Sequence, residues 1–353
     1  MMKSFRTAAG VIPAAALVVA MSAASAKADM TSDLYEKAKA EGALTLYTGG
    51  PVAPYQGIVA EFEQKFPGIK VSVTGGFSNV LNDKIEQQLK AGKLEADMAL
   101  FQTAQDFVAW KKRNLLLNFQ VEGHENIAPV FKDPDGAFTT ARVNAIAYAY
   151  NKNAVAANEV PKSALDFLKP EFSDKIITCY PADDDATLYV FYTIVQKYGW
   201  SYMDRFMANK PSFIQGHLGV IRAIASGERL VTFDATTSTT GSLKQSGAPV
   251  ELVIPQDDPI VTFTLTAGIF KDAPHPNAAK LFLNWYLQPE QQRRSGVFSA
   301  RTDVPPPAGF KPLSAANAAL DYNAFVSNEP LIIDLRKRFE AYTGPVVNKG
   351  GVQ

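Results

Sequence analysis

The fold is decided by the stretch from Ala273 to Gln292, which reads Ala-Pro-His-Pro-Asn-Ala-Ala-Lys-Leu-Phe-Leu-Asn-Trp-Tyr-Leu-Gln-Pro-Glu-Gln-Gln. Pro274 and Pro276 disfavour helix before them, and Asn277 is a good N-cap residue for a helix that starts there. Pro289 ends this helix, and a further helical turn can begin after it. Four apolar residues recur between these limits at helical spacing: Leu281, Phe282, Trp285 and Tyr286. By itself the pattern predicts a helix with one buried face.

The beginning of the chain has the composition of an export signal. Lys3 and Arg6 precede an uncharged, alanine-rich stretch over residues 7–26, and small residues suit cleavage just after it. We therefore expect residues 1–28 to be a secretory signal peptide that is removed. The alternative is a membrane anchor, which Pro13 and the thin apolar run disfavour. No cysteine lies near the cleavage site, so we expect the mature protein to be free in a periplasm, without a lipid anchor.

Composition then limits the class of the mature protein. About 325 residues remain after cleavage, enough for two domains of ordinary size. The whole chain has 35 basic and 35 acidic residues, and loss of Lys3, Arg6 and Lys27 leaves 32 basic against 35 acidic residues. This balance gives no reason to expect nucleic acid or an anionic membrane surface as a partner. Cys179 is the only cysteine, so the exported chain must be stable without an internal disulfide, and we expect this side chain to be buried.

Helical and strand patterns alternate along the first third of the mature chain. Helices are expected over 34–41, 55–66 and 80–91, and strands over 43–47, 69–73 and 96–101. Strand-helix-strand units of this length predict a parallel sheet with helices on its faces, the arrangement of an α/β fold.

Several segments together resemble one known family. They include Glu-Lys-Ala-Lys-Ala-Glu-Gly-Ala-Leu-Thr-Leu-Tyr-Thr at 36–48, Phe-Glu-Gln-Lys-Phe-Pro-Gly-Ile-Lys-Val at 62–71, and the segments at 91–98, 160–166, 225–228 and 273–292. Taken in order, they resemble bacterial extracellular solute-binding proteins of the iron(III) type, over nearly all of the mature chain. The resemblance implies a two-lobe, type II periplasmic binding protein fold of the α/β class, with paired crossover strands. It also implies a monomer that delivers a small solute to an inner-membrane ABC permease.

The resemblance further implies where the lobes lie. Lobe 1 is expected at 29–141 and 260–300, lobe 2 at 151–255, and the hinge crossovers at 142–150 and 256–259. The remaining segment, 301–353, is expected to pack on the lobes through positions at helical spacing: Leu331, Leu335 and Phe339.

Candidate binding residues follow from the position of strand ends. Ligands of open α/β sheets lie beyond the carboxyl ends of the strands, where backbone amides and helix starts point outward. In lobe 1 these positions hold small or polar residues: Thr48, Gly49, Ser78, Asn79, Gln102 and Thr103. The alternative for each of these loops is turn geometry alone.

The second lobe has an unusual polar segment from Asp234 to Thr240, with a run of five hydroxyl side chains, which we expect to be a loop after a strand. We take Asp234, Thr236, Thr237 and Ser238 as candidate ligand contacts. The region resembles the place where ferric-binding members of the family have two adjacent tyrosines, but no such pair stands here. Threonine and serine hydroxyls stay protonated and are poor ligands for a hard trivalent ion. The segment therefore favours an oxyanion or a polyol, and the alternative is a capping and turn-forming role.

Three further sites carry charged or titratable side chains. Arg142, at the entrance to the first crossover, suits a carboxylate or phosphate, and its alternative is a surface ion pair. Within Asp183-Asp184-Asp185 one carboxylate is expected to be a helix N-cap, while Asp184 and the nearby Thr187 are candidates to meet a ligand. His217 is a candidate contact, although a lone histidine is more often structural.

Nothing in the sequence favours catalysis. There is no Gly-x-Ser-x-Gly elbow, and the three histidines, His124, His217 and His275, lack metal-ligand spacing. We expect a receptor that is not an enzyme and that needs no cofactor or metal. Its solute is expected to be small and polar, anionic or zwitterionic, such as an organophosphonate or a sugar phosphate. Two alternatives stay open: a ferric receptor that uses an accessory anion, and a divalent-metal-dependent periplasmic hydrolase based on the three acids.

Overall fold

The structure is a computed structural model that describes residues 32–294, 297–308 and 310–347. The expected signal peptide, 1–28, lies outside the described residues. After a helix over residues 32–41, the strands are β1 (Ala43–Gly49), β2 (Lys70–Gly76), β3 (Met98–Phe101), β4 (Thr139–Asn151), β5 (Ile177–Cys179), β6 (Ser212–Ile214), β7 (Val231–Thr236), β8 (Val250–Val253), β9 (Ile260–Ile269) and β10 (Ala318–Ala319).

The helices alternate with these strands. They are α2 (Ala53–Lys65), α3 (Ser78–Lys90), α4 (Ala104–Lys112), α5 (Asp185–Tyr198), α6 (Ser201–Ala208), α7 (His217–Ser226), α8 (Thr237–Gln245), α9 (Pro276–Tyr286), α10 (Pro289–Arg294), α11 (Tyr322–Val326) and α12 (Glu329–Thr343). Short 3-10 helices lie at His124–Asn126, Pro129–Phe131, Ala164–Leu168, Pro170–Phe172 and Leu313–Ala315. Within the described ranges, no helix combines the length and the apolar character needed to cross a membrane.

The main sheet has the strand order β2-β1-β3-β9-β4-β7, and β8 and β10 pair with β4 and β9. β1 is parallel to both β2 and β3, as the alternating pattern predicts, whereas β9 is antiparallel to β3 and to β4. β5 and β6 form a parallel pair, and a bridge from Ile176 to Val231 joins this pair to β7. The sheet therefore continues from one lobe into the other.

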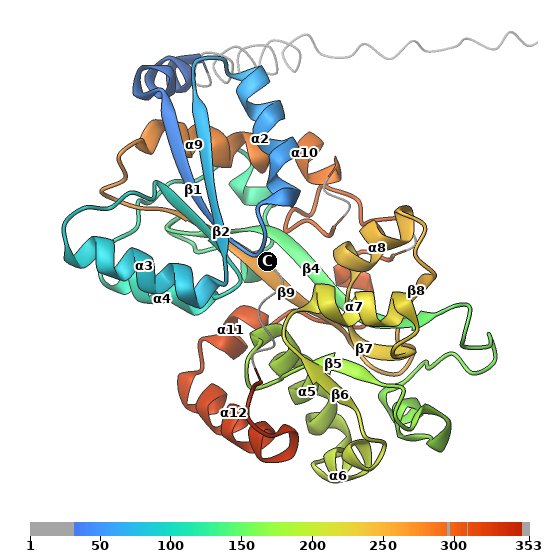
Figure 1. Cartoon of the computed structure of the whole chain (residues 1–353). Coiled ribbons are helices and arrows are strands. Elements are labelled where there is room, and N and C mark those ends of the chain that lie inside the picture. The colour runs from blue at the N-terminus through green and yellow to red at the C-terminus, as the bar shows by residue number, and fades with distance from the viewer. Residues whose placement is uncertain (1–31, 295–296, 309, 348–353) are drawn as a thin grey trace, which may run out of the picture.

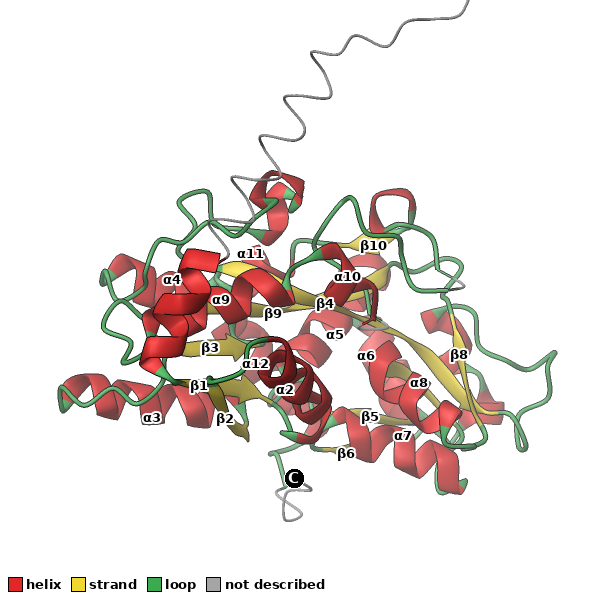
Figure 2. Cartoon of the chain, turned by 90° about the horizontal axis from the view of Figure 1, so that it is seen from above, coloured by secondary structure: helices red, strands yellow, loops and turns green. Residues whose placement is uncertain are grey.

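Two long strands make that continuation, as Figure 1 shows. β4 pairs with β9 from Thr139 to Ile146 and with β8 from Tyr148 to Asn151. Figure 2 shows β4 and β9 running across the molecule between α3 at one end and α7 and α8 at the other. The second crossover is not one continuous strand, because residues 254–259 form a loop between β8 and β9 and do not pair with β4. The hinge positions expected at 256–259 thus lie in this loop, not in a strand.

The core of the first lobe explains why the stretch 273–292 matters. Phe62 of α2 packs against two residues of α9, with ring centroids 5.1 Å from Phe282 and 5.3 Å from Trp285. The start of α9 is fixed by the fully buried carboxylate of Asp97, which accepts hydrogen bonds from the backbone N–H groups of Thr45 and His275, both at 2.6 Å. The predicted buried helix face is confirmed, and α10 supplies the further turn after Pro289.

The core of the second lobe is largely aromatic. Phe233 on β7 is its centre, with ring centroids 5.1 to 5.3 Å from those of Phe167, Phe191 and Phe206. Phe339 of α12 packs against Phe191 in the same cluster, so the C-terminal segment contributes to this lobe. Cys179 is buried and unpaired, as expected.

Most of the predicted elements are present, with small shifts at their boundaries, and two predictions are wrong. The segment 234–240 is not a loop: residues up to Thr236 belong to β7, and α8 begins at Thr237. Strand pairing with β4 overrides the turn preference of the hydroxyl residues. Asn277 is not the N-cap, because α9 begins at Pro276 and the Asn277 side chain instead donates a hydrogen bond to Glu41.

Glycines in the first lobe offer a matched test of this packing. A Cβ at Gly75 would lie 2.7 Å from the carbonyl oxygen of Gly50, whereas a Cβ at Gly57, inside α2, would meet nothing within 4 Å. We expect Gly75→Ala to lower the free energy of unfolding by about 1–3 kcal/mol through overpacking. Gly57→Ala should raise it by roughly 0.5–1 kcal/mol through helix propensity. Urea unfolding measures both, and a Gly75→Ala variant as stable as the wild type would contradict the packing of β2 against the chain after β1.

Candidate functional site

The strand ends of the first lobe gather small and polar residues. Thr48 pairs with Gly75 on β2 and with Leu100 on β3, so the three parallel strands end at one edge. There the Ser78 hydroxyl accepts a hydrogen bond from the backbone N–H of Gln102 at 3.3 Å. The Thr48 side chain is fully buried. The loops that hold Thr48, Gly49, Ser78 and Gln102 are therefore neighbours, while Asn79 is exposed and Thr103 donates its hydroxyl hydrogen to Asp106.

Strand ends of both lobes lie beside the crossover strands. Phe101, the last residue of β3, pairs with Thr266 on β9, and Thr236, the last residue of β7, pairs with Ile146 on β4. The helices that follow start at the same ends: α2, α3 and α4 in the first lobe and α5, α7 and α8 in the second. Helix N-termini carry unpaired N–H groups and partial positive charge, which favours an anion. We call this region the junction.

In the second lobe, the partly buried His217 pairs with the fully buried Asp234. His217 Nε2 lies 3.0 Å from Asp234 Oδ1. The other oxygen of Asp234 accepts hydrogen bonds from the Thr178 hydroxyl, the Cys179 N–H and the Thr187 hydroxyl. Burial lowers the pKa of His217, but the charges of Asp234 and Asp184 outweigh it and raise the pKa to about 9. Asp234 is thus buried with its hydrogen bonds satisfied inside the protein.

A metal at this place is a natural alternative, because Cys179, His217 and Asp234 hold donor atoms within 4.8 Å of one another. These side chains are better suited to hold a proton on His217 than to bind a metal ion. Burial, with the charges of Asp234 and Asp184 adding to it, raises the pKa of the Cys179 thiol, so the thiolate that a metal needs is disfavoured. The Asp234 oxygens already accept hydrogen bonds that coordination would break.

The three predicted acids are also engaged. Asp184 is the N-cap of α5, as predicted for one acid of the three, and accepts a hydrogen bond from the Thr187 N–H at 2.9 Å. Asp185 is buried and contacts Gln105 of α4 at 3.3 Å and the guanidinium of Arg336 in α12. Asp183 accepts a hydrogen bond from Gln215 at 2.8 Å. These carboxylates stabilise α5 and its contacts with the neighbouring elements.

Arg142 differs from these groups because it has no carboxylate partner among the described residues. It lies on β4 beside the hydroxyl groups of Tyr55, from the first turn of α2, and Tyr286, from the last turn of α9. From the sequence, Tyr286 is predicted to lie on the apolar helix face, and Tyr55 is not a candidate site residue. No local pattern separates either tyrosine from an ordinary core residue.

Several polar side-chain atoms at the junction are buried yet lack a hydrogen-bond partner within the described part of the chain. They are Thr48 Oγ1, Thr140 Oγ1, Arg142 Nε, Thr236 Oγ1 and Tyr286 Oη. Buried polar groups in native proteins are normally paired, and each unpaired one costs about 1–3 kcal/mol. Buried polar atoms that have no partner within the protein are available to form hydrogen bonds with a bound molecule.

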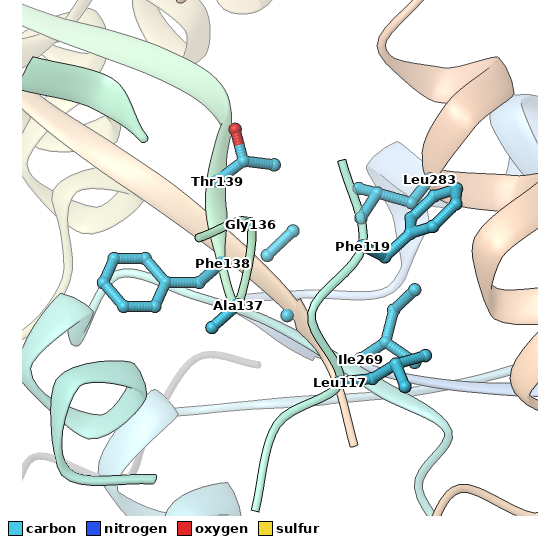
Figure 3. Close-up of a pocket in the computed structure, with 10 residues that line it drawn as sticks. Leu117, Phe119, Gly136, Ala137, Phe138, Thr139, Ile269 and Leu283 are labelled. Carbon is cyan, nitrogen blue, oxygen red and sulfur yellow. The ribbon is translucent and has the colours of Figure 1, made fainter. Parts of the chain in front are cut away.

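A small pocket in the first lobe is not a comparable site (Figure 3). Thr139 supplies the only polar side chain among its lining residues, which include Leu117, Phe119, Ile269 and Leu283. The pocket lacks the several polar groups needed to orient a polar solute.

The raised pKa of His217 predicts a pH dependence of stability. Below pH 6.5 the imidazole is protonated in both the folded and the unfolded chain, so its pairing with Asp234 contributes fully. As the pH rises from 6.5 toward 9, the unfolded chain releases this proton while the folded chain keeps it. The contribution of the pair to the free energy of unfolding therefore falls by about 3 kcal/mol in total. We expect His217→Gln and Asp234→Asn to lack this loss between pH 6.5 and 9 in urea unfolding. A wild-type slope that persists in both variants would show that other groups cause it.

Comparisons with known proteins identify the family and the fold. The model of the bacterial extracellular solute-binding protein family matches residues 48–293. No curated protein matches the chain. Iron-bound HitA from Pseudomonas aeruginosa is a similar solved structure, with 19% identity, a TM-score of 0.70, and coverage of 84% of this chain and 99% of that one. AfuA from Actinobacillus pleuropneumoniae with bound fructose-6-phosphate has 19% identity, a TM-score of 0.68, and coverage of 86% and 98%.

A ferric binding protein from Campylobacter jejuni has 21% identity, a TM-score of 0.67, and coverage of 84% and 99%. At these identities the structures show the fold alone, the two-lobe fold of type II periplasmic binding proteins. The family match shows more than the fold, because it spans over two thirds of the chain. It includes all of β4, β9 and the strand ends at the junction. The chain belongs to the bacterial extracellular solute-binding protein family.

Proposed function

We propose that the chain is the periplasmic substrate-binding component of an ABC importer and captures a small anionic solute, such as an organophosphonate or a sugar phosphate. The observation that carries the proposal is the set of buried, unpaired polar atoms at the junction, with Arg142 among them. The mature protein acts as a monomer in the periplasm after loss of residues 1–28, and passes its solute to an inner-membrane permease.

The charge of the solute follows from Arg142. A partly buried guanidinium is costly unless a negative charge accompanies it, and no carboxylate of the described residues does so here. The helix starts at the junction add partial positive charge. A zwitterion such as an aminoalkylphosphonate has weaker support, because Asp183, Asp184 and Asp185 already have partners within the protein.

The proposed mechanism is closure of the lobes on the solute. Lobe 1 comprises 29–141 and 260–300 and lobe 2 comprises 151–255, and the bending segments lie in β4 and beside the loop 254–259. A solute that touches both lobes gains contacts only when they are closed, so it shifts the population toward the closed form. The candidate contacts in lobe 1 and the first crossover are Thr48, Gly49, Ser78, Asn79, Gln102, Thr103 and Arg142. Those in lobe 2 are His217, Thr236, Thr237 and Ser238, while Asp234 acts by holding His217. Asp184 and Thr187, also candidates from the sequence, are instead engaged within the protein.

A ferric receptor is the second candidate function, since HitA and the Campylobacter jejuni protein are described as iron-bound and ferric-binding. Two tyrosines, Tyr55 and Tyr286, do come together here, but the charge of Arg142 beside them repels a trivalent cation. We expect titration with ferric citrate to produce no visible phenolate-to-iron absorption. A band that appears, and is lost in Tyr286→Phe, would favour the ferric function over the anionic one.

The proposal is tested by identifying the solute. Native mass spectrometry of freshly purified protein detects a molecule carried through purification. A thermal-shift panel of alkylphosphonates, sugar phosphates, dicarboxylates, polyamines and neutral sugars then ranks the classes. We expect phosphonates or sugar phosphates to raise Tm most, because a ligand at 100 times its Kd stabilises the native state by about 2.7 kcal/mol. A rise with polyamines or neutral sugars alone would contradict an anionic solute. Turnover of a phosphoester, abolished by a chelator, would instead favour the hydrolase.

A further inference from the structure

Arg142, Tyr55 and Tyr286 come from three elements that are distant in sequence and converge on one point. Arg142 lies on β4, Tyr55 in the first turn of α2 and Tyr286 in the last turn of α9. Both tyrosines are buried, with 3% of the residue surface exposed in each case, and the Tyr286 hydroxyl has no hydrogen-bond partner in the described structure. The Arg142 guanidinium lies beside both phenol oxygens and is partly accessible.

We propose that these three side chains form an anion subsite that takes a tetrahedral oxyanion, the phosphoryl or phosphonate group of the solute. The inference rests on the proposed function and deepens it, because it assigns the charged end of the solute to one place on lobe 1 and the first crossover.

The backbone places Arg142 for this role. Thr140 pairs with Thr266 and Arg142 pairs with the adjacent Leu265, so Ala141 is an extra residue in β4. A bulge of this kind bends the strand and redirects the side chains next to it, and bulges are frequent beside functional sites. Without the extra residue, a regular strand would carry Arg142 in a different register relative to α2 and α9.

The same bulge is tied to α9. The buried side chain of Gln292 donates hydrogen bonds to the carbonyl oxygen of Ala141 at 3.2 Å and to that of Tyr286 at 2.9 Å. One amide therefore holds the residue before Arg142 and the residue that carries the second phenol. This contact fixes the spacing of two subsite groups before any solute arrives, which lowers the cost of binding.

The protonation of the phenols indicates which kind of ligand fits. Burial raises the pKa of both tyrosines above the ordinary range, and the positive charge of Arg142 only partly opposes it. The phenols therefore remain protonated at neutral pH and act as hydrogen-bond donors. Two O–H donors and a guanidinium together offer hydrogen bonds and positive charge, which suits an anion and opposes a metal ion.

The positions of the three donor groups favour a tetrahedral oxyanion, which has at least three oxygens, over a carboxylate, which has two. The groups come from β4, from the N-terminal turn of α2 and from the C-terminal end of α9, so they approach from different elements. A tetrahedral group can turn a different oxygen toward each of them, whereas a planar carboxylate has two oxygens in one plane. The N-terminus of α2, with Tyr55 as its third residue, adds a favourable helix dipole.

Calorimetric titration with inorganic phosphate, methylphosphonate and acetate tests the subsite in the full mature chain. Arg142→Gln removes the charge at similar size, and Tyr286→Phe removes one hydroxyl and keeps the ring. The matched controls are Arg113→Ala, whose guanidinium pairs with Glu86 at the surface, and Tyr35→Phe, whose hydroxyl donates to the Pro67 carbonyl. Thermal melts establish that each variant is folded.

We expect phosphate and methylphosphonate to bind the wild type more tightly than acetate does. Arg142→Gln should weaken phosphate binding about 10- to 100-fold, and Tyr286→Phe about 5- to 10-fold, as for loss of a charge-assisted hydrogen bond. The controls should stay within about twofold of the wild type, as expected for surface groups away from the subsite. Acetate binding as tight as phosphate binding, no phosphate binding to the wild type, or unchanged affinity in Arg142→Gln would each overturn the subsite. If a panel solute binds with equal affinity in all variants, the subsite is wrong and the receptor function stands; if no panel solute binds, the proposed function fails first.

Discussion

The antiparallel pairing of β4 with β9 is the constraint on which the rest of the structure depends. These strands continue from one lobe into the other, and each lobe builds its own sheet on them: β3, β1 and β2 beside β9, and β7 beside β4. Their register sets where the strand ends of both lobes lie along the crossover, because Phe101 pairs with Thr266 and Thr236 pairs with Ile146. A shift by one residue would turn every side chain of a strand to the opposite face. The junction is therefore a product of strand pairing.

Buried charged side chains in this molecule fall into two groups, those with partners inside the protein and one without a counter-charge among the described residues. Asp97 and Asp234 are fully buried, and each accepts several hydrogen bonds from neighbouring elements, which offsets the cost of removing a carboxylate from water. Arg142 lacks such a counter-charge in the described structure, and its Nε is unpaired. The contrast separates groups that stabilise the fold from a group whose remaining hydrogen bonds and charge are open to a solute.

The C-terminal segment links the two lobes at the back of the crossover. Tyr322 of α11 donates its hydroxyl hydrogen to the Gln102 carbonyl at the end of β3, and Asn323 accepts a hydrogen bond from Thr264 of β9 at 2.6 Å. Nearby, Asp185 of α5 contacts Gln105 of α4 and Arg336 of α12. Any movement of the lobes must preserve or exchange these contacts.

The sequence by itself determined the α/β class, the elements between residues 34 and 101, the buried face of α9 and the family, since each depends on local periodicity, on breakers such as Pro289, or on motifs read along the chain. It also placed an acid at the N-cap of α5, because that preference is local. Only the tertiary structure decided that Asp234 is a buried partner of His217, that the hydroxyl run begins a helix, and that Tyr55 and Tyr286 flank Arg142. The physical reason is that these three facts depend on pairing between strands and packing between helices far apart in the chain, and no local pattern records which side chains those contacts bring together.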